Sequence, residues 1–132
     1  MRALVTGGAG FIGSHLTERL LKDGHQVAII DNLSTGRLEN IETCRGHSYL
    51  ELVVGDIRDA KLVEPLVERS DAIFHLAAAV GVRLIAEDPV RTIETNIGGT
   101  EIVLNAAGKF GKKTLIASSS EVYGKSEAVP FR

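Results

Sequence analysis

The chain has 132 residues, the size of one domain, and 44% apolar and 24% charged residues, the balance of a soluble globular protein. Fifteen basic and seventeen acidic side chains give a net charge of −2, so the basic excess that predicts nucleic-acid binding is missing. The single Cys44 excludes an intrachain disulfide and a cysteine-based metal cluster. No apolar run approaches the roughly 20 residues of a membrane span. We expect a cytoplasmic protein that binds no metal, membrane or nucleic acid.

Short apolar runs alternate with amphipathic segments along the chain. The runs predict buried strands at residues 2–6, 26–30, 50–54, 72–76 and 113–117. Helical spacing of apolar residues predicts helices at 11–23, 59–69 and 89–107, the last with Asp88 as its cap and Pro89 in its first turn. Residues 32–48 should be irregular with one short turn. Strands that alternate with helices predict an α/β fold built on a doubly wound parallel sheet.

Apolar stripes and glycine clusters add detail to this pattern. In helix 59–69 we expect three inward side chains, Leu62, Leu66 and Val67. In helix 89–107 one face carries Val90, Ile93, Ile97, Leu104 and Ala107. The 14 glycines exceed the average usage of about 7% and gather near residue 10 and at positions 98 and 99, which indicates backbone that closely approaches something.

The first glycine cluster lies between the first predicted strand and the first predicted helix. Gly8, Gly10 and Gly13 match Gly-x-Gly-x-x-Gly, and Gly7, Gly10 and Gly13 match Gly-x-x-Gly-x-x-Gly. The early glycines permit a tight turn, Gly10 lets the backbone approach a pyrophosphate, and Gly13 lets the helix pack on the sheet. The helix start then offers free N–H groups to phosphates. The alternative is a tight turn that binds nothing.

An acidic residue follows at the distance that dinucleotide binding requires. Asp31 closes the second strand 18 residues after Gly13, close to the usual spacing of about 20. A carboxylate here accepts hydrogen bonds from ribose hydroxyls and repels a 2′-phosphate, which favours NAD over NADP. An aspartate at a strand end can also be a simple loop cap. Arg37, six residues further on, is interpreted as a solvated loop charge or an adenine-edge contact.

Six segments in a fixed order resemble the extended short-chain dehydrogenase/reductase family, specifically its nucleotide-sugar epimerases and dehydratases. They are TGGAGFIGS (6–14), DNLSTG (31–36), GDIRD (55–59), HLAA (75–78), TNIGGT (95–100) and SSSEVYG (118–124). The resemblance covers the whole chain. It implies a Rossmann-type fold that binds NAD, with five strands present and with the C-terminal strands and the substrate lobe missing.

The resemblance also implies which residues contact the cofactor. For the pyrophosphate these are Gly7, Gly10, Phe11 and Ile12, and around the adenosine ribose they are Asp31, Asn32, Ser34, Thr35 and Gly36. Two residues flank the adenine, Asp56 and Ile57, and three line the cofactor after the fourth strand, Leu76, Ala77 and Ala78. Asn96 resembles the family asparagine that fixes the active-site structure.

Each of these residues also has a plain structural interpretation. Asp56 could cap the helix that starts near Asp59, and the alanines could be ordinary close packing. Asn96 could face solvent, and close packing of the helix would explain Gly98 and Gly99. His75 lies within an apolar strand, where a core histidine with satisfied hydrogen bonds is more frequent than a catalytic one.

The resemblance places the reactive groups after the fifth strand. Ser119 would hydrogen-bond the sugar C4 oxygen, and Ser120 and Glu121 occupy the positions of the acid and base of the dehydratases. A serine is a poor proton donor for expelling water, which favours an epimerase, with a decarboxylase or a dehydratase as alternatives. Glu121 could instead hold the turn. Residues 80–83 are expected to border the sugar.

The family's Tyr-x-x-x-Lys motif, which supplies the chemical base, is absent from this chain. Tyr49 and Tyr123 are followed four residues later by Val53 and Glu127. We therefore expect residues 1–132 to be the NAD-binding domain of a longer enzyme, without its substrate domain and inactive alone. The longer enzyme would be a homodimer acting on a UDP-linked nucleotide sugar. The alternative is a non-catalytic NAD-binding module.

Overall fold

The computed structural model describes residues 1–80, 86–124 and 130. The strands are β1 (Arg2–Thr6), β2 (Gln26–Asp31), β3 (Leu50–Val54), β4 (Ala72–His75) and β5 (Lys113–Ile116). They form one parallel sheet in the order β3–β2–β1–β4–β5. The predicted doubly wound, Rossmann-type α/β fold is confirmed, and each strand lies within one residue of its predicted bounds.

The helical segments lie between successive strands, except the last one, which follows β5. They are α1 (Phe11–Lys22), the 3₁₀ turn η1 (Leu38–Ile41), α2 (Ala60–Glu68), α4 (Pro89–Ile93), the π-helical η2 (Glu94–Gly98), α5 (Gly99–Lys109) and the 3₁₀ turn η3 (Ser120–Tyr123). The connection between β2 and β3 holds one short 3₁₀ turn, as predicted. No helix in the described part of the chain is long and apolar enough to cross a membrane.

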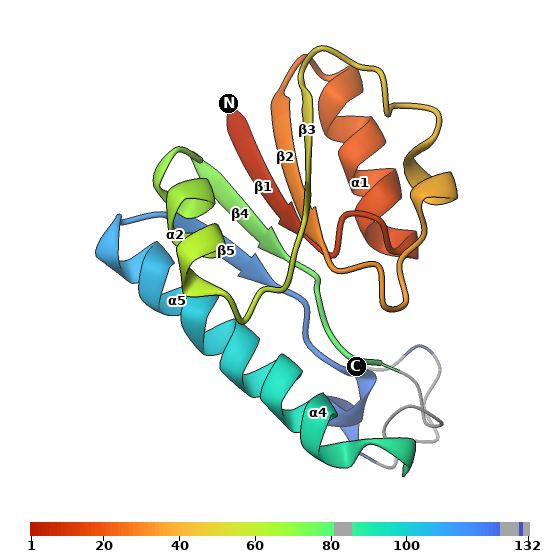
Figure 1. Ribbon diagram of the computed structural model, residues 1–132, viewed down its shortest axis with the longest axis vertical. Coiled ribbons are helices and arrows are strands. Elements are labelled where there is room, and N and C mark those ends of the chain that lie inside the picture. The colour runs from red at the N-terminus through yellow and green to blue at the C-terminus, as the bar shows by residue number, and fades with distance from the viewer. Residues whose placement is uncertain (81–85, 125–129, 131–132) are drawn as a thin grey trace.

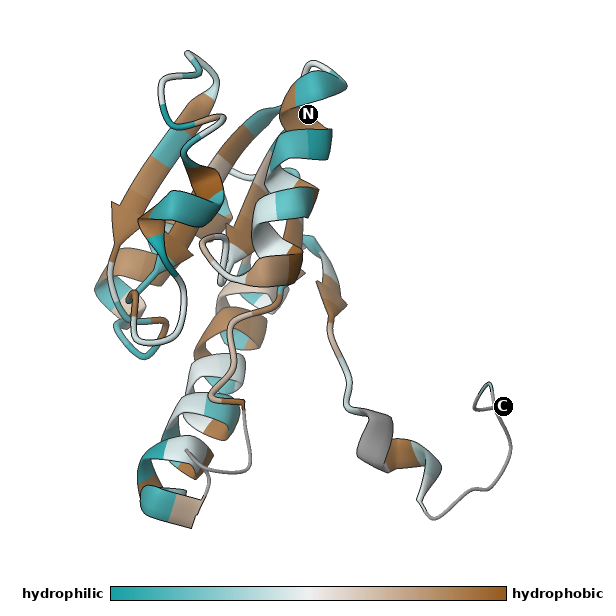
Figure 2. Cartoon of the chain, turned by 90° about the vertical axis from the view of Figure 1, so that its right-hand side faces the viewer, coloured by the Kyte–Doolittle hydropathy of each residue, from teal (hydrophilic) through white to brown (hydrophobic). Residues whose placement is uncertain are grey.

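The central strands β1 and β2 are buried on both faces, which explains why they are continuous apolar runs rather than alternating ones, whereas Leu115 and Ile116 of the edge strand β5 are exposed. Figure 1 shows α1 on one face and α2 with α5 on the other. Along β1, Val5 faces the core under α1, where Ile41 also packs, while Leu4 faces the core under α2 and α5, where Val103 packs. In Figure 2 the strands are coloured largely brown, as hydrophobic.

Helix α2 lies within one residue of its predicted bounds, and two of its three predicted inward side chains are buried. Asp59 caps its start by accepting a hydrogen bond from the Lys61 amide at 2.9 Å. Val63, with Leu66 and Val67, forms the buried stripe, whereas Leu62 is 39% exposed, so its predicted inward position is wrong. Residues at i, i+3 and i+4 share a helix face, and this stripe leaves Leu62 at the rim.

The third predicted helix is interrupted by the π-helical segment η2. The capping by Asp88 is confirmed, since its carboxylate accepts from the Arg91 amide at 3.1 Å. The apolar side chains predicted on one face divide, because Ala107 is buried while the others, Val90, Ile93, Ile97 and Leu104, are exposed. The π turn, which a 3.6-residue period does not anticipate, rotates the segments before and after it relative to each other.

Candidate functional site

The loops after all five strands leave the same edge of the sheet, because the strands are parallel (Figure 1). The glycine turn follows β1 at this edge. Gly7 has φ +71°, a conformation that favours glycine, and a Cβ there would come within 2.9 Å of the Ala77 backbone. The Gly7 amide donates to the Ile30 carbonyl at 2.8 Å. The turn is therefore packed directly against the end of β4.

Gly13 is packed tightly against the turn, as predicted, whereas Gly10 is open on one side. A Cβ on Gly13 would overlap the Gly7 carbonyl oxygen and approach the Gly8 Cα to 2.8 Å, so only glycine permits this packing of α1. A Cβ on Gly10 would meet only the Gly7 oxygen, at 3.2 Å. The backbone at Gly10 is thus open on its other side, where a ligand can approach closely.

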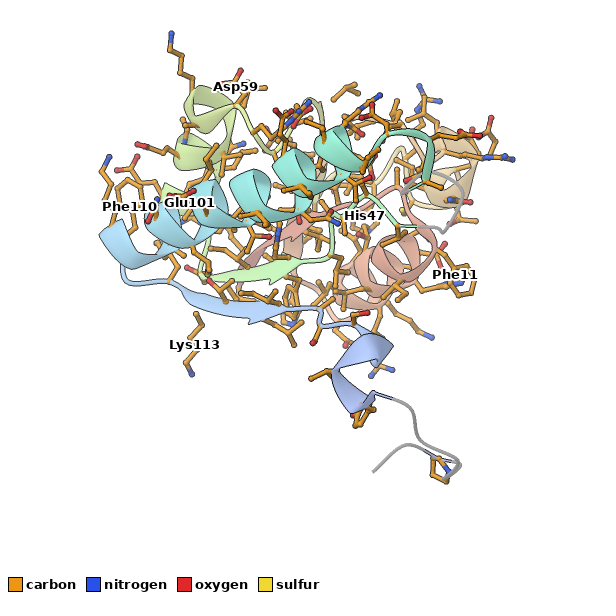
Figure 3. The ribbon with its side chains drawn as sticks, turned by 90° about the horizontal axis from the view of Figure 1, so that it is seen from below. Phe11, His47, Asp59, Glu101, Phe110 and Lys113 are labelled. Carbon is orange, nitrogen blue, oxygen red and sulfur yellow. The ribbon has the colours of Figure 1, made fainter. Side chains whose placement is uncertain are left out.

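The start of α1 has the features of an anion site. Its N-cap is Gly10, no side chain caps its amides, and its first turn holds no acidic residue. Phe11 and Ile12 are 77% and 66% exposed, and Figure 3 shows Phe11 projecting outward from the helix. The free N–H groups and the positive dipole end at the start of this twelve-residue helix can bind the negative charge of a diphosphate.

Asp31 makes contacts that the sequence did not predict. Its carboxylate accepts from the Ala9 amide at 2.9 Å and from the Leu33 amide at 2.8 Å, and the residue is only 7% exposed. The second bond holds Leu33 at φ +58°, an uncommon conformation for a residue other than glycine. A Cβ on Gly36 would lie 2.8 Å from this carboxylate, so a glycine is needed beside it.

The loop after β2 also fixes the glycine turn from outside. The Ala9 carbonyl accepts from the Arg37 amide at 3.0 Å and from Nδ2 of Asn40 at 2.7 Å. The three remaining predicted ribose contacts, Asn32, Ser34 and Thr35, are exposed on this loop. The structure therefore brings the two predicted halves of the dinucleotide motif into contact, and Asn40 joins them although no motif singled it out.

Asp56 is bound by an arginine two residues away and does not cap α2. Its carboxylate accepts from Nε and Nη2 of Arg58 at 3.0 and 2.7 Å, and from the Arg58 amide at 2.9 Å. The Arg58 guanidinium lowers the pKa of Asp56 from 3.8 to about 2. Arg58 also lies 3.5 Å from the Glu94 carboxylate, and the neighbouring Ile57 is buried against Gly99.

The segment after β4 is held at both of its ends. The Leu76 and Ala77 amides each donate to Oγ1 of Thr6 at 3.1 Å. The side chain of Asn96 accepts from the Ala79 amide at 2.7 Å and donates to the Ala79 carbonyl at 3.0 Å. The solvent-facing interpretation of Asn96 is therefore wrong, and its predicted role in fixing local structure agrees with this geometry. Ala78, between these anchors, is exposed.

The predicted reactive residues follow β5, the neighbour of β4 in the sheet. Ser119 is exposed, and its carbonyl accepts from the Val122 amide at 3.2 Å, which opens η3. Figure 3 shows η3 beyond the end of β5. The side chains of Ser120 and Glu121, and residues 81–83 of the expected sugar border, lie outside the described part of the structure. The roles of all these residues stay predictions.

A surface hollow of about 340 Å³ lies at the opposite edge of the sheet. Its lining includes Arg2, Gln26, Tyr49, Glu51 and Arg69, none of which belongs to the predicted site. Ligands of open α/β sheets bind at the carboxyl ends of the strands, so the candidate site is the one at the other edge. Among the described residues, no group of three or more His, Cys, Asp or Glu side chains is arranged to hold a metal.

Comparison with known proteins identifies relatives of three activities. UDP-glucuronic acid decarboxylase 1 of Danio rerio is 45% identical over 129 residues, which are 98% of this chain and 30% of that protein. UDP-glucose 4-epimerase of Mycolicibacterium smegmatis is 44% identical over 133 residues, covering 98% of this chain and 42% of the epimerase. The structure of DesIV, a dTDP-glucose 4,6-dehydratase of Streptomyces venezuelae with NAD and TYD bound, matches with a TM-score of 0.90 at 37% identity, over 97% of this chain and 42% of DesIV.

The chain spans less than half the length of each of these proteins. The family model described as GDP-mannose 4,6 dehydratase matches residues 4–132. The segment order, the glycine turn and the strand order agree with this match. The chain belongs to this family, among the epimerases and dehydratases of the extended short-chain dehydrogenases/reductases.

Proposed function

We propose that residues 1–132 form the NAD-binding part of an enzyme that epimerises a nucleotide sugar by transient oxidation at C4. The observation that carries this proposal is the uncapped start of α1 behind the glycine turn, with Asp31 bonded to the same turn. DesIV, which shares the fold at 37% identity, was determined with NAD bound.

The residues at the strand ends divide the binding of NAD among them. The Phe11 and Ile12 amides at the start of α1 hold the pyrophosphate, which Gly7 and Gly10 allow to lie close to the backbone. Asp31 accepts from the ribose hydroxyls through the lone pairs that its two backbone bonds leave free, and its charge disfavours a 2′-phosphate. Asp56 and Ile57 border the adenine, and residues 76–78 line the cofactor.

The bound nicotinamide supplies hydride transfer to and from sugar C4. Ser119 orients the C4 oxygen by hydrogen bonding, and a tyrosine outside this chain takes the hydroxyl proton. Because Ser120 is a poor acid for expelling water, epimerisation is favoured over dehydration. The family also predicts a homodimer, and the exposed apolar side chains of Val90, Ile93 and Ile97 are available for such an interface.

A decarboxylase is the second candidate, because UDP-glucuronic acid decarboxylase 1 of Danio rerio is 45% identical to the chain. The two activities are distinguished by incubating the full gene product with UDP-glucose and with UDP-glucuronate. We expect UDP-galactose from UDP-glucose and no carbon dioxide from UDP-glucuronate. Carbon dioxide release would establish the decarboxylase and contradict the epimerase.

The gene itself tests whether this chain belongs to a longer enzyme. We expect the reading frame to continue past Arg132 into a Tyr-x-x-x-Lys motif, and the 132-residue chain alone to turn over no UDP-sugar. A frame that stops at Arg132, together with NAD binding, would instead support a non-catalytic NAD-binding module.

A further inference from the structure

A hydrogen-bonded network of polar side chains, the His75 network, runs from Thr6 on β1 through His75 on β4 and Thr100 on α5 to Asn96. Thr6 and His75 are buried, and Thr100 and Asn96 are half-buried. His75, at the end of β4, is 3% exposed. Its Nδ1 lies 2.8 Å from Oγ1 of Thr6 on β1, and its Nε2 lies 2.9 Å from Oγ1 of Thr100 on α5. The prediction of a core histidine with satisfied hydrogen bonds is therefore confirmed, and both of its partners are hydroxyl groups.

The donors and acceptors present fix the direction of every hydrogen bond in the His75 network. Oγ1 of Thr6 already accepts from the amides of Leu76 and Ala77, so its own proton donates to Nδ1 of His75. The ring proton must then be on Nε2, where it donates to Oγ1 of Thr100. Thr100 in turn donates to the Asn96 carbonyl at 2.6 Å. Only the neutral imidazole with its proton on Nε2 satisfies all of these groups.

The neutral form of the ring agrees with its surroundings. Burial lowers the pKa of His75 below its ordinary value of 6.5. An imidazolium would present a second N–H to Thr6, whose hydroxyl proton would then lose its acceptor.

Thr6 and Asn96, the two ends of the His75 network, are the two anchors of the segment that follows β4. Thr6 holds the beginning of residues 76–79 through the Leu76 and Ala77 amides, and Asn96 holds the end through Ala79. His75 and Thr100 connect the two anchors through the protein interior. The glycine turn also packs on this segment, because Gly7 lies against the Ala77 backbone.

We propose that His75, as the Nε2-protonated tautomer, is a positioning residue that fixes the cofactor-lining segment 76–79 between the glycine turn and the π-helical turn. The proposal rests on the proposed NAD site. His75 touches neither cofactor nor substrate in this role. Through Thr6 and Thr100, it fixes the position of the glycine turn relative to the π-helical turn.

The tautomer is measured directly in the ligand-free 132-residue chain. With ¹⁵N-labelled histidine at neutral pH, we expect the His75 ring to show a protonated Nε2 and an unprotonated Nδ1. A ring protonated on Nδ1, or on both nitrogens, would overturn the proposal. This measurement needs no variant, so it does not depend on whether a substituted chain folds.

The positioning role is tested by Thr100→Val, which keeps the shape of the side chain and removes its hydroxyl. We expect NAD affinity to fall roughly tenfold, the equivalent of one buried hydrogen bond, and the amide signals of Leu76, Ala77 and Ala79 to shift together. Thr100→Ser should restore both. Unchanged affinity in Thr100→Val, or no rescue by serine, would overturn the proposal.

Thr92→Val is the matched control. Like Thr100, Thr92 donates its hydroxyl proton to the carbonyl four residues earlier, which is that of Asp88 at 2.9 Å. Thr92 lies in α4 and takes no part in the His75 network. We expect its affinity for NAD to equal that of the wild type, and an equal loss in both variants would overturn the specific role of Thr100. A wild-type protein that binds no NAD would refute the proposed function. The ring tautomer and the amide shifts test the His75 network independently of NAD binding.

Discussion

Replacing Gly13 by alanine tests the close packing that forms the glycine turn. The added Cβ would overlap the Gly7 carbonyl oxygen and lie 2.8 Å from the Gly8 Cα and 2.9 Å from the Gly7 carbonyl carbon. All three are backbone atoms, so no side chain can rotate away. Overpacking of this kind costs roughly 1–3 kcal/mol, and the severity of these contacts favours the upper end. Alanine recovers about 1 kcal/mol of helix propensity.

The net expectation is a loss of about 2 kcal/mol in the free energy of unfolding, which lowers Tm by roughly 6–10 °C for a domain of this size. Gly108→Ala is the control, because Gly108 lies in α5 and a Cβ there would meet nothing within 4 Å. We expect that variant to gain about 1 kcal/mol. Circular dichroism melts of both variants decide the matter, and a Gly13→Ala chain as stable as Gly108→Ala would refute the packing argument.

Three further predictions concern other parts of the site. Asp31→Asn should lower stability by about 1–3 kcal/mol and reduce the preference for NAD over NADP, because an amide cannot accept both backbone bonds and carries no charge; calorimetric titration with each cofactor measures this. The lowered pKa of Asp56 contributes stability that is present above pH 3.8 and is lost as the pH falls through about 2. Because Asp56 and Arg58 are each about a third exposed, that contribution should be about 1 kcal/mol, and acid melts of Arg58→Ala should lack it. Gly99→Ala should destabilise the chain by about 1–3 kcal/mol through overlap with the Ile57 side chain, whereas Gly98→Ala, which meets nothing within 4 Å, should not; equal melts would contradict this.

The bounds of the central strands could be predicted because burial on both faces leaves uninterrupted apolar runs. β1 and β3 have their predicted bounds, and Gly24, just after α1, takes the left-handed conformation at φ +81° that glycine favours at a helix end. The face of α2 could not be predicted, because Leu62 and Val63 are equally apolar and only packing against α5 distinguishes them. The π turn at 94–98 departs from the 3.6-residue period and has no periodic signature in the sequence.

The candidate site was predictable where backbone geometry itself demands a residue type. Gly7, with its positive φ, and Gly13, with its close packing on the Gly7 carbonyl, are such positions. The contacts of Asp31 with the Ala9 and Leu33 amides were not, because a carboxylate at a strand end has the same sequence signature with or without them. Thr6 was also missed, although a hydroxyl residue closing a buried strand beside a glycine turn was the available signal.

Calorimetric titration of the wild-type chain with NAD tests the central claim most directly. We predict saturable binding at one site per chain, with weaker binding of NADP because the Asp31 carboxylate repels its 2′-phosphate. No heat of binding at millimolar NAD would contradict the assignment of the glycine turn and Asp31 to a dinucleotide.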